Sequence, residues 1–114
     1  MSGRVASHFK FKSSIITFMN IKEQIDKIIK SVEYKQNDAC TRACVEMKLH
    51  QLLNKYVCEG KIIDYTIICD ERNNSSFVIE NNDIIVYIDW VDIFNQKHKY
   101  EVSFQKITKE QYEN

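Results

Sequence analysis

The spacing of apolar residues changes once along this 114-residue chain, and the change comes at Gly60. Before Gly60 the apolar residues recur every three to four positions, which is typical of amphipathic helices. From Lys61 onward they recur every second position, which is typical of strands. The sequence therefore predicts an α+β fold of two layers, with two N-terminal helices packed on an antiparallel sheet of three or four strands.

The first helix is predicted to begin at Asn20, a good N-cap residue, with Glu23 three positions later as in a capping box. Residues 1–19 carry four basic residues and no acidic one, and we expect them to form a leader or arm. The folded unit is then 20–108, followed by a polar tail, 109–114. The buried stripe of this helix is apolar at three- and four-residue spacing: Ile21, Ile25, Ile28, Ile29 and Val32.

The second helix is predicted over residues 39–57. Asp38 is the expected N-cap, and Gly60 stands where a left-handed residue ends many helices. The buried stripe again has helical spacing: Val45, Leu49, Leu52, Leu53, Tyr56 and Val57.

Three strands are predicted, over 62–70, 84–93 and 100–107, with a loop at 71–76 and a hairpin connection at 95–98. Since 84–93 is joined in sequence to both other strands, we expect it at the centre of a meander. Alternation predicts these inward residues in the first and third strands: Ile63, Tyr65, Ile67 and Cys69; Tyr100, Val102 and Phe104. In the second strand it places Ile84, Val86, Ile88 and Trp90 on one face and Ile85, Tyr87, Asp89 and Val91 on the other.

Composition excludes several classes of protein. The chain has no proline and only two glycines, so the glycine-rich loops that hold nucleotide phosphates are missing. Sixteen basic and sixteen acidic residues balance, which argues against a direct nucleic-acid binder. No apolar run reaches the roughly 20 residues of a spanning helix, so we expect no membrane insertion.

The four cysteines are interpreted as free thiols in a reducing compartment. Cys40 and Cys44 share a helix face and are expected to pack there, while Cys69 is expected in the core. The spacing of zinc knuckles is absent. A thiol or metal protein that uses Cys40, Cys44 and Cys58 remains the less favoured alternative. We expect no enzyme activity and no cofactor.

A series of short motifs follows the first helix. Its members, in chain order, are Asn37-Asp38, Thr41-Arg42, Leu52-Leu53, Gly60, Cys69-Asp70-Glu71 and Asn73-Asn74. In this order they resemble the C-terminal domain of contractile phage tail sheath proteins, of which this chain would be a truncated, stand-alone relative.

The resemblance implies a non-enzymatic structural protein of a phage or phage-like particle. It would assemble through sheet edges and terminal arms into a tail, baseplate or neck, with copies of itself or other virion proteins as partners. It would reside in the virion, and in the host cytoplasm before assembly. The residues implied in structure or assembly are these: Asp38, Thr41, Arg42, Gly60, Asp70, Asn73 and Asn74.

Two further expectations concern individual residues. Arg42 should be structural, paired with Asp38 at the start of the second helix. Ser103 lies in the edge strand nearer a chain terminus, so a proline there tests whether that edge makes the interface. The alternative function from another class is a small soluble regulatory or partner-binding module that acts as a dimer.

Overall fold

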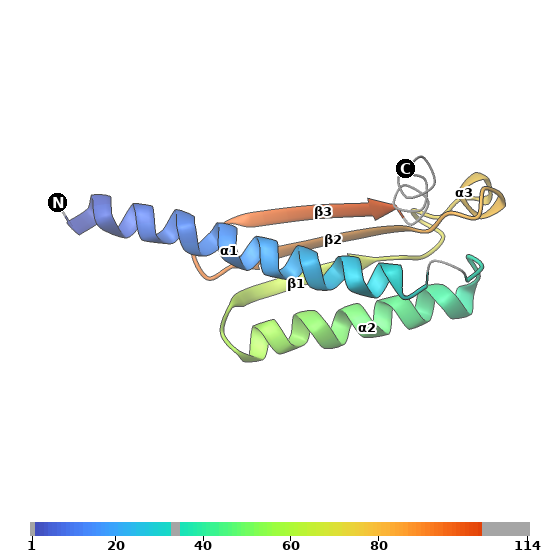
Figure 1. Cartoon of the computed structure of the whole chain (residues 1–114), viewed down its shortest axis with the longest axis horizontal. Coiled ribbons are helices and arrows are strands. Elements are labelled where there is room, and N and C mark those ends of the chain that lie inside the picture. Colours follow the sequence, from blue (N-terminus) through green and yellow to red (C-terminus); the bar gives the residue numbers. More distant parts are fainter. Residues whose placement is uncertain (1, 33–34, 104–114) are drawn as a thin grey trace.

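The division of the chain at Gly60 is confirmed in the computed structural model, which describes residues 2–32 and 35–103, with side chains from Ser14 onward (Figure 1). Two helices, α1 (Ser2–Lys30) and α2 (Ala39–Cys58), come before a three-stranded sheet. The strands are β1 (Ile62–Ile68), β2 (Ile85–Asp92) and β3 (Lys97–Ser103), and a short helix, α3 (Ser76–Glu80), lies between β1 and β2. The predicted α+β fold is therefore confirmed.

The start predicted for the first helix is wrong, because α1 begins at Ser2 rather than at Asn20. Ser14 and Phe18 precede Ile21 at helical spacing and extend its inward stripe backward. Ser14 is buried and Phe18 packs against the core, so part of the expected leader belongs to the packed layer. Asn20 lies on the exposed side of a continuing helix.

α2 agrees closely with its predicted range. The Asp38 carboxylate accepts a hydrogen bond from the Thr41 amide at 2.7 Å, which confirms Asp38 as the N-cap. At the other end Gly60 has a φ of 73°. Its amide bonds to the Val57 carbonyl and the Lys61 amide to the Tyr56 carbonyl, which together form a Schellman motif.

β2 is the central strand, and it is antiparallel to β1 and to β3 as predicted. The register of β1 against β2 shifts between Ile62 and Asp64. This bulge turns Ile62 inward and leaves Ile63 54% exposed, so the inward placement predicted for Ile63 is wrong. Beyond the bulge Cys69 is buried, as predicted.

The hairpin between β2 and β3 is shorter than predicted. β3 begins at Lys97, so residues 97 and 98 belong to the strand and pair with Val91 and Trp90. Asn95 takes the positive φ of 66° that the tight connection requires. Val102 is buried as predicted, whereas Phe104 and the predicted end of this strand lie outside the described residues.

Both long helices cover the same face of the sheet, and the core lies between these two layers (Figure 1). In β2 every second residue is buried, including Trp90, the largest core side chain. The buried hydrophobic residues come from both helices and all three strands: Ile21, Ile25, Ile29, Val32, Val45, Leu49, Leu53, Ile62, Cys69, Ile84, Val86, Ile88, Trp90 and Val102.

Candidate functional site

The structure brings most of the predicted site residues to one end of the sheet, where β1 ends, α2 begins and β2 starts. The residues gathered there are Asp38, Thr41, Arg42, Asp70, Asn73 and Asn74. Ser103 joins them because its hydroxyl donates to the Asp83 carboxylate at 2.7 Å. Gly60 lies at the opposite end, where it terminates α2.

Asn74 is the centre of this group and is 2% exposed. Its side-chain oxygen accepts the Ile85 amide at 2.9 Å, and its side-chain nitrogen donates to the Ile85 carbonyl, also at 2.9 Å. The Asn73 amide nitrogen donates to the carbonyls of Ile68 and Ile85. Because β1 ends at Ile68, which pairs with Tyr87, no β1 residue lies opposite Ile85. The side chains of Asn73 and Asn74 make the hydrogen bonds to the Ile85 backbone that a β1 residue would otherwise make.

Asn37 ties the start of α2 to the same group, and it was not among the residues predicted to act there. Its amide nitrogen donates to Asn74 Oδ1 at 3.0 Å and to the Asp83 carbonyl at 2.6 Å. We expected Arg42 to pair with Asp38. Instead, Arg42 Nη1 donates to Asn37 Oδ1 at 2.5 Å, so the side-chain partner of the guanidinium is a neutral amide.

Two carboxylates border this amide group and remain ionised. The hydrogen bond from the Thr41 amide lowers the pKa of Asp38. Hydrogen bonds from Arg72, whose guanidinium lies 2.8 Å from the carboxylate, lower the pKa of Asp70. Neither residue presents the raised pKa expected of a general acid, so the geometry here supports the fold rather than proton transfer.

A second polar group lies at the hairpin end and was missed from the sequence. Asp92 is 2% exposed, and its Oδ2 accepts the Ser14 hydroxyl at 2.6 Å and His98 Nε2 at 2.9 Å. Its Oδ1 accepts the backbone amides of Phe94 and Gln96. The available signal was alternation along β2, since Asp92 continues the inward series that ends with Trp90.

These four hydrogen bonds keep Asp92 charged inside the protein. Burial opposes ionisation, but the bonds from Ser14, His98 and the two amides outweigh it and lower the pKa of Asp92 to about 2. The residue types match those of a catalytic triad, whereas the geometry does not. Ser14 and His98 both address Oδ2 of the same carboxylate, so His98 Nε2 is not placed to take the serine proton.

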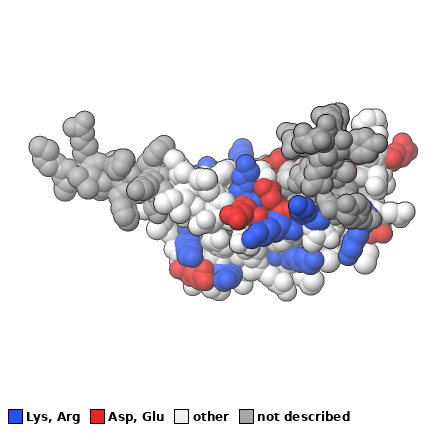
Figure 2. Space-filling view, viewed as in Figure 1, with Lys and Arg blue, Asp and Glu red and all other residues white. Residues whose placement is uncertain are grey.

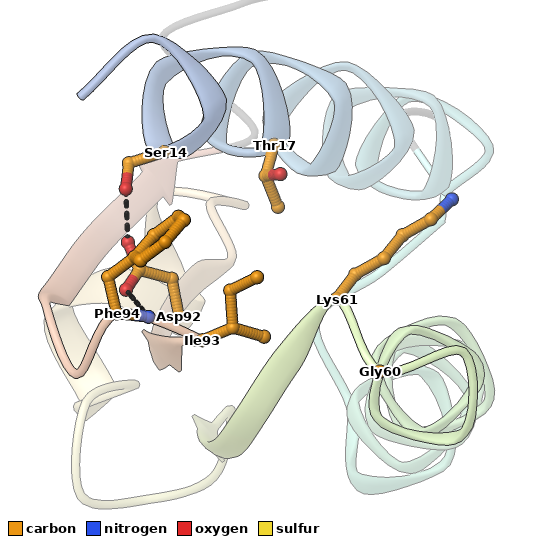
Figure 3. A pocket seen from close by; sticks show the side chains of 7 residues that line it. All are labelled: Ser14, Thr17, Gly60, Lys61, Asp92, Ile93 and Phe94. Carbon is orange, nitrogen blue, oxygen red and sulfur yellow. Dashed lines mark hydrogen bonds between the residues drawn. The ribbon is translucent and has the colours of Figure 1, made fainter. Parts of the chain in front are cut away.

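A pocket of about 100 Å³ opens beside Asp92, between α1 and the turn that joins α2 to β1 (Figure 3). Its walls come from three parts of the chain: Ser14, Thr17, Gly60, Lys61, Asp92, Ile93 and Phe94. Ligand pockets usually measure about 300–1,000 Å³. This pocket is therefore too small for a substrate or an organic cofactor of ordinary size.

The cysteines occupy different environments. Cys40 and Cys58 are exposed and Cys44 is half-buried, so the packed position expected for Cys40 is wrong. Burial, reinforced by the Glu46 carboxylate, raises the pKa of Cys69 to about 12, which keeps that thiol protonated and unreactive. Within the described ranges no three side chains of the metal-binding types come close enough to hold an ion.

The two edges of the sheet differ in how their outward amides are used. Asp64 Oδ1 accepts the Tyr65 amide at 2.8 Å, and Glu46 Oε1 accepts the Cys69 amide at 3.2 Å. The bulge at Ile63 further interrupts this side of β1. Carboxylates and bulges of this kind block the addition of another strand, so β1 is a protected edge.

β3 is the other edge, and among the described residues its one strand neighbour is β2. The Asp92 amide donates to the Gln96 carbonyl, so Asp92 and Gln96 form a hydrogen-bonded pair of the β2–β3 ladder. In an antiparallel ladder such pairs occur at every second residue, so the even-numbered residues of β3 bond to β2. The amides of the odd-numbered residues point away from β2: Lys97, Lys99, Glu101 and Ser103. In Figure 1 β3 runs along the side of the sheet away from α2. The N-terminal part of α1 extends beyond the sheet, and its later part passes in front of β2 and β1.

Charges of both signs are interspersed on the face drawn in Figure 2, in keeping with the balanced composition. Among the helices of the described chain, none is long and apolar enough to cross a bilayer. No family model, curated protein or solved structure matches this chain.

Proposed function

We propose that this protein is a non-enzymatic assembly protein that adds the free edge of β3 to a neighbouring protein. The observation that carries the proposal is the contrast between the edges. Side-chain carboxylates accept two outward amides along the β1 edge, those of Tyr65 and Cys69, whereas in the described part of the chain β3 has a strand neighbour on one side alone. Strand addition gains affinity from main-chain hydrogen bonds and specificity from alternate side chains.

The particle in which this edge would act is inferred from the resemblance to the tail sheath family. Four of the six ordered motifs of that resemblance lie at the end of the sheet where α2, β1 and β2 are joined: Asn37-Asp38, Thr41-Arg42, Cys69-Asp70-Glu71 and Asn73-Asn74. A stable three-stranded unit with one usable edge suits a small component of a tail, baseplate or neck. Its partners would be other copies or other virion proteins, and it would pass from the host cytoplasm into the virion.

The test replaces outward amides of β3. Ser103→Pro and Glu101→Pro each remove one donor from the open side of the sheet, and proline is tolerated at strand edges of this kind. Ser103→Ala is the matched control, because it removes the hydroxyl bonded to Asp83 but keeps the amide. We expect the proline variants to be excluded from purified particles and Ser103→Ala to be incorporated, as measured by quantitative mass spectrometry.

Circular dichroism of each isolated variant shows whether the fold survives. A well-folded Ser103→Pro protein that enters particles normally would rule out this edge as the interface. Absence of the wild-type chain from particles, at levels expected of a component, would rule out the virion role itself.

A second candidate function is a soluble partner-binding module that acts as a dimer. It is favoured by an apolar group on the outer side of α1, where Ile15, Ile16 and Met19 are 43%, 50% and 61% exposed. Clustered exposed apolar residues mark interaction surfaces more often than isolated ones do. A stable dimer in solution together with absence from particles would support this second function.

A further inference from the structure

We infer that β3 pairs with β3 of a second copy, antiparallel and centred on Tyr100, so that two sheets join into one of six strands. This inference rests on the proposed use of the β3 edge, and it names the partner and the register. The partner is a second copy because one register of β3 against itself makes opposite-charge pairs with no like charges directly opposite one another.

The first argument is the direction of the amides. Those of Lys97, Lys99, Glu101 and Ser103 point to the open side. When the two-fold axis passes through Tyr100, Lys99 faces Glu101 of the second copy and Lys97 faces Ser103. Each outward amide of β3 then lies opposite another outward amide, so all of them can form hydrogen bonds across the junction.

The second argument is charge. Lys99 and Glu101 are both exposed, and both lie on the face of the sheet away from the helices. Directly opposite residues in an antiparallel pair share a face, so this register makes two Lys–Glu pairs across the junction. Asp89 lies opposite Lys99 within each copy, and acidic and basic residues therefore alternate along that row of the joined sheet.

The neighbouring registers that use the same amides are worse. When the axis moves by one residue toward the hairpin, Lys99 lies directly opposite Lys99 of the second copy. When it moves by one residue the other way, Glu101 lies directly opposite Glu101 of the second copy. Like charges directly opposite one another are destabilising, so the register centred on Tyr100 is selected.

The third argument is the inner side of the junction. Tyr100 is half-buried, donates its hydroxyl to Asp26 and has Lys22 Nζ 5.6 Å from its ring centre. These contacts hold the ring in place before association. At the centre of the junction the two Tyr100 residues form a non-hydrogen-bonded pair, the type in which side chains come closest.

The test is a charge swap followed by sedimentation velocity of the full chain over a range of concentrations. Lys99→Glu creates two Glu–Glu pairs and Glu101→Lys creates two Lys–Lys pairs. Each change should weaken the dimer on the order of tenfold or more. The double variant carrying both changes restores two opposite-charge pairs, and its dimer constant should return to within a few-fold of wild type.

Lys55→Glu is the matched control, because it makes the same change of charge at an exposed position of α2, on the side of the molecule away from β3. It should shift the dimer constant by no more than about twofold. Circular dichroism verifies that each variant keeps its fold.

A wild-type chain that stays monomeric at every concentration, or a double variant that fails to regain dimerisation, would overturn the inference. These results are separable from the proposed function. Proline variants that are lost from particles, with charge variants that enter normally, would keep β3 as the interface and assign its partner to another protein.

Discussion

The two ends of the sheet are held by polar side chains of different chemistry. Where β1 ends, the carboxamides of Asn37, Asn73 and Asn74 bond to backbone groups and to each other. At the hairpin, the Asp92 carboxylate gathers the Ser14 hydroxyl, His98 and two backbone amides. Each group joins segments far apart in sequence, by 37 residues for Asn37 and Asn74 and by 78 for Ser14 and Asp92.

The difference follows from what each group can bond. A carboxamide donates and accepts, so one Asn74 side chain satisfies both the amide and the carbonyl of Ile85 and can extend a strand ladder. A carboxylate only accepts, so Asp92 is suited to a turn with surplus donors. The carboxamides of the amide end do not titrate, whereas the bonds at the hairpin end depend on the ionisation of Asp92 and hence on pH.

The largest effect should come from Asn74→Ala, which breaks the amide end. The change leaves the Ile85 amide without its acceptor in a part-buried place, which costs about 1–3 kcal/mol. It also removes the donor to the Asp70 carbonyl and the acceptor of Asn37, while the Ile85 carbonyl keeps its bond from Asn73. We expect the free energy of unfolding to fall by about 3 kcal/mol, measured by urea denaturation.

Asn81→Ala is the control for this measurement. Asn81 is exposed and bonds to the Phe77 carbonyl, so its loss should cost about 0.5 kcal/mol or less. An Asn74→Ala protein as stable as this control would show that the carboxamide does not substitute for a strand residue.

Asp92→Asn should have the next largest effect. The asparagine keeps the shape of the side chain but cannot accept all four hydrogen bonds as a charged group, and we expect a loss of about 2 kcal/mol at neutral pH. The loss should be smaller in acid. Because Asp92 binds a proton less tightly in the folded chain than in the unfolded chain, its contribution is full above pH of about 4 and disappears as the pH falls through about 2.

Urea denaturation of wild type and Asp92→Asn between pH 7 and pH 2 measures this convergence. Asn74→Ala should show a constant deficit over the same range, because the amide does not titrate. Parallel curves for wild type and Asp92→Asn would contradict the account of the hairpin end.

The periodicity of the sequence predicted the helices, the strands and their order, because burial of one face imposes a spacing of 3.6 or 2. It placed the helix start wrongly at Asn20, where a capping pattern competes with an inward stripe that continues back to Ser14. It also missed the bulge at Ile63. Ile62 and Ile63 are both apolar, so alternation could not distinguish which of them faces the core.

The candidate site was predictable only in part. The local bond between Asp38 and Thr41 could be read from sequence, since a cap spans three residues. The partners of Asn37 and Asn74 could not be, because they depend on how distant segments meet in the folded chain. The bonds from Glu46 and Asp64 to outward amides of the β1 edge could not be predicted from the sequence either.

Arg42→Ala should have a smaller effect on the amide end. It removes the hydrogen bond to Asn37 but leaves the bonds from Asn37 to Asn74 and Asp83 in place, and we expect a loss of about 1 kcal/mol. Arg72→Ala is the matched control, because its pair with Asp70 is exposed and should contribute little. A loss of several kcal/mol for Arg42→Ala would mean that the guanidinium holds the entire group together.

The smallest effect is expected from reductant and chelator, because neither end of the sheet is held by a thiol. The four cysteines are free, and Cys69 packs in the core as a protonated side chain. We therefore expect that neither disulfide bonds nor bound metal contribute to the stability of the fold. The melting temperature measured with both reagents should stay within a few degrees of the untreated value. A Cys69→Ser variant, which places a hydroxyl among apolar neighbours, serves as the positive control and should melt lower in either buffer. A collapse of the treated wild-type protein would mean that metal or disulfide bonds contribute to one end, and the comparison between amide and carboxylate would then have to include them.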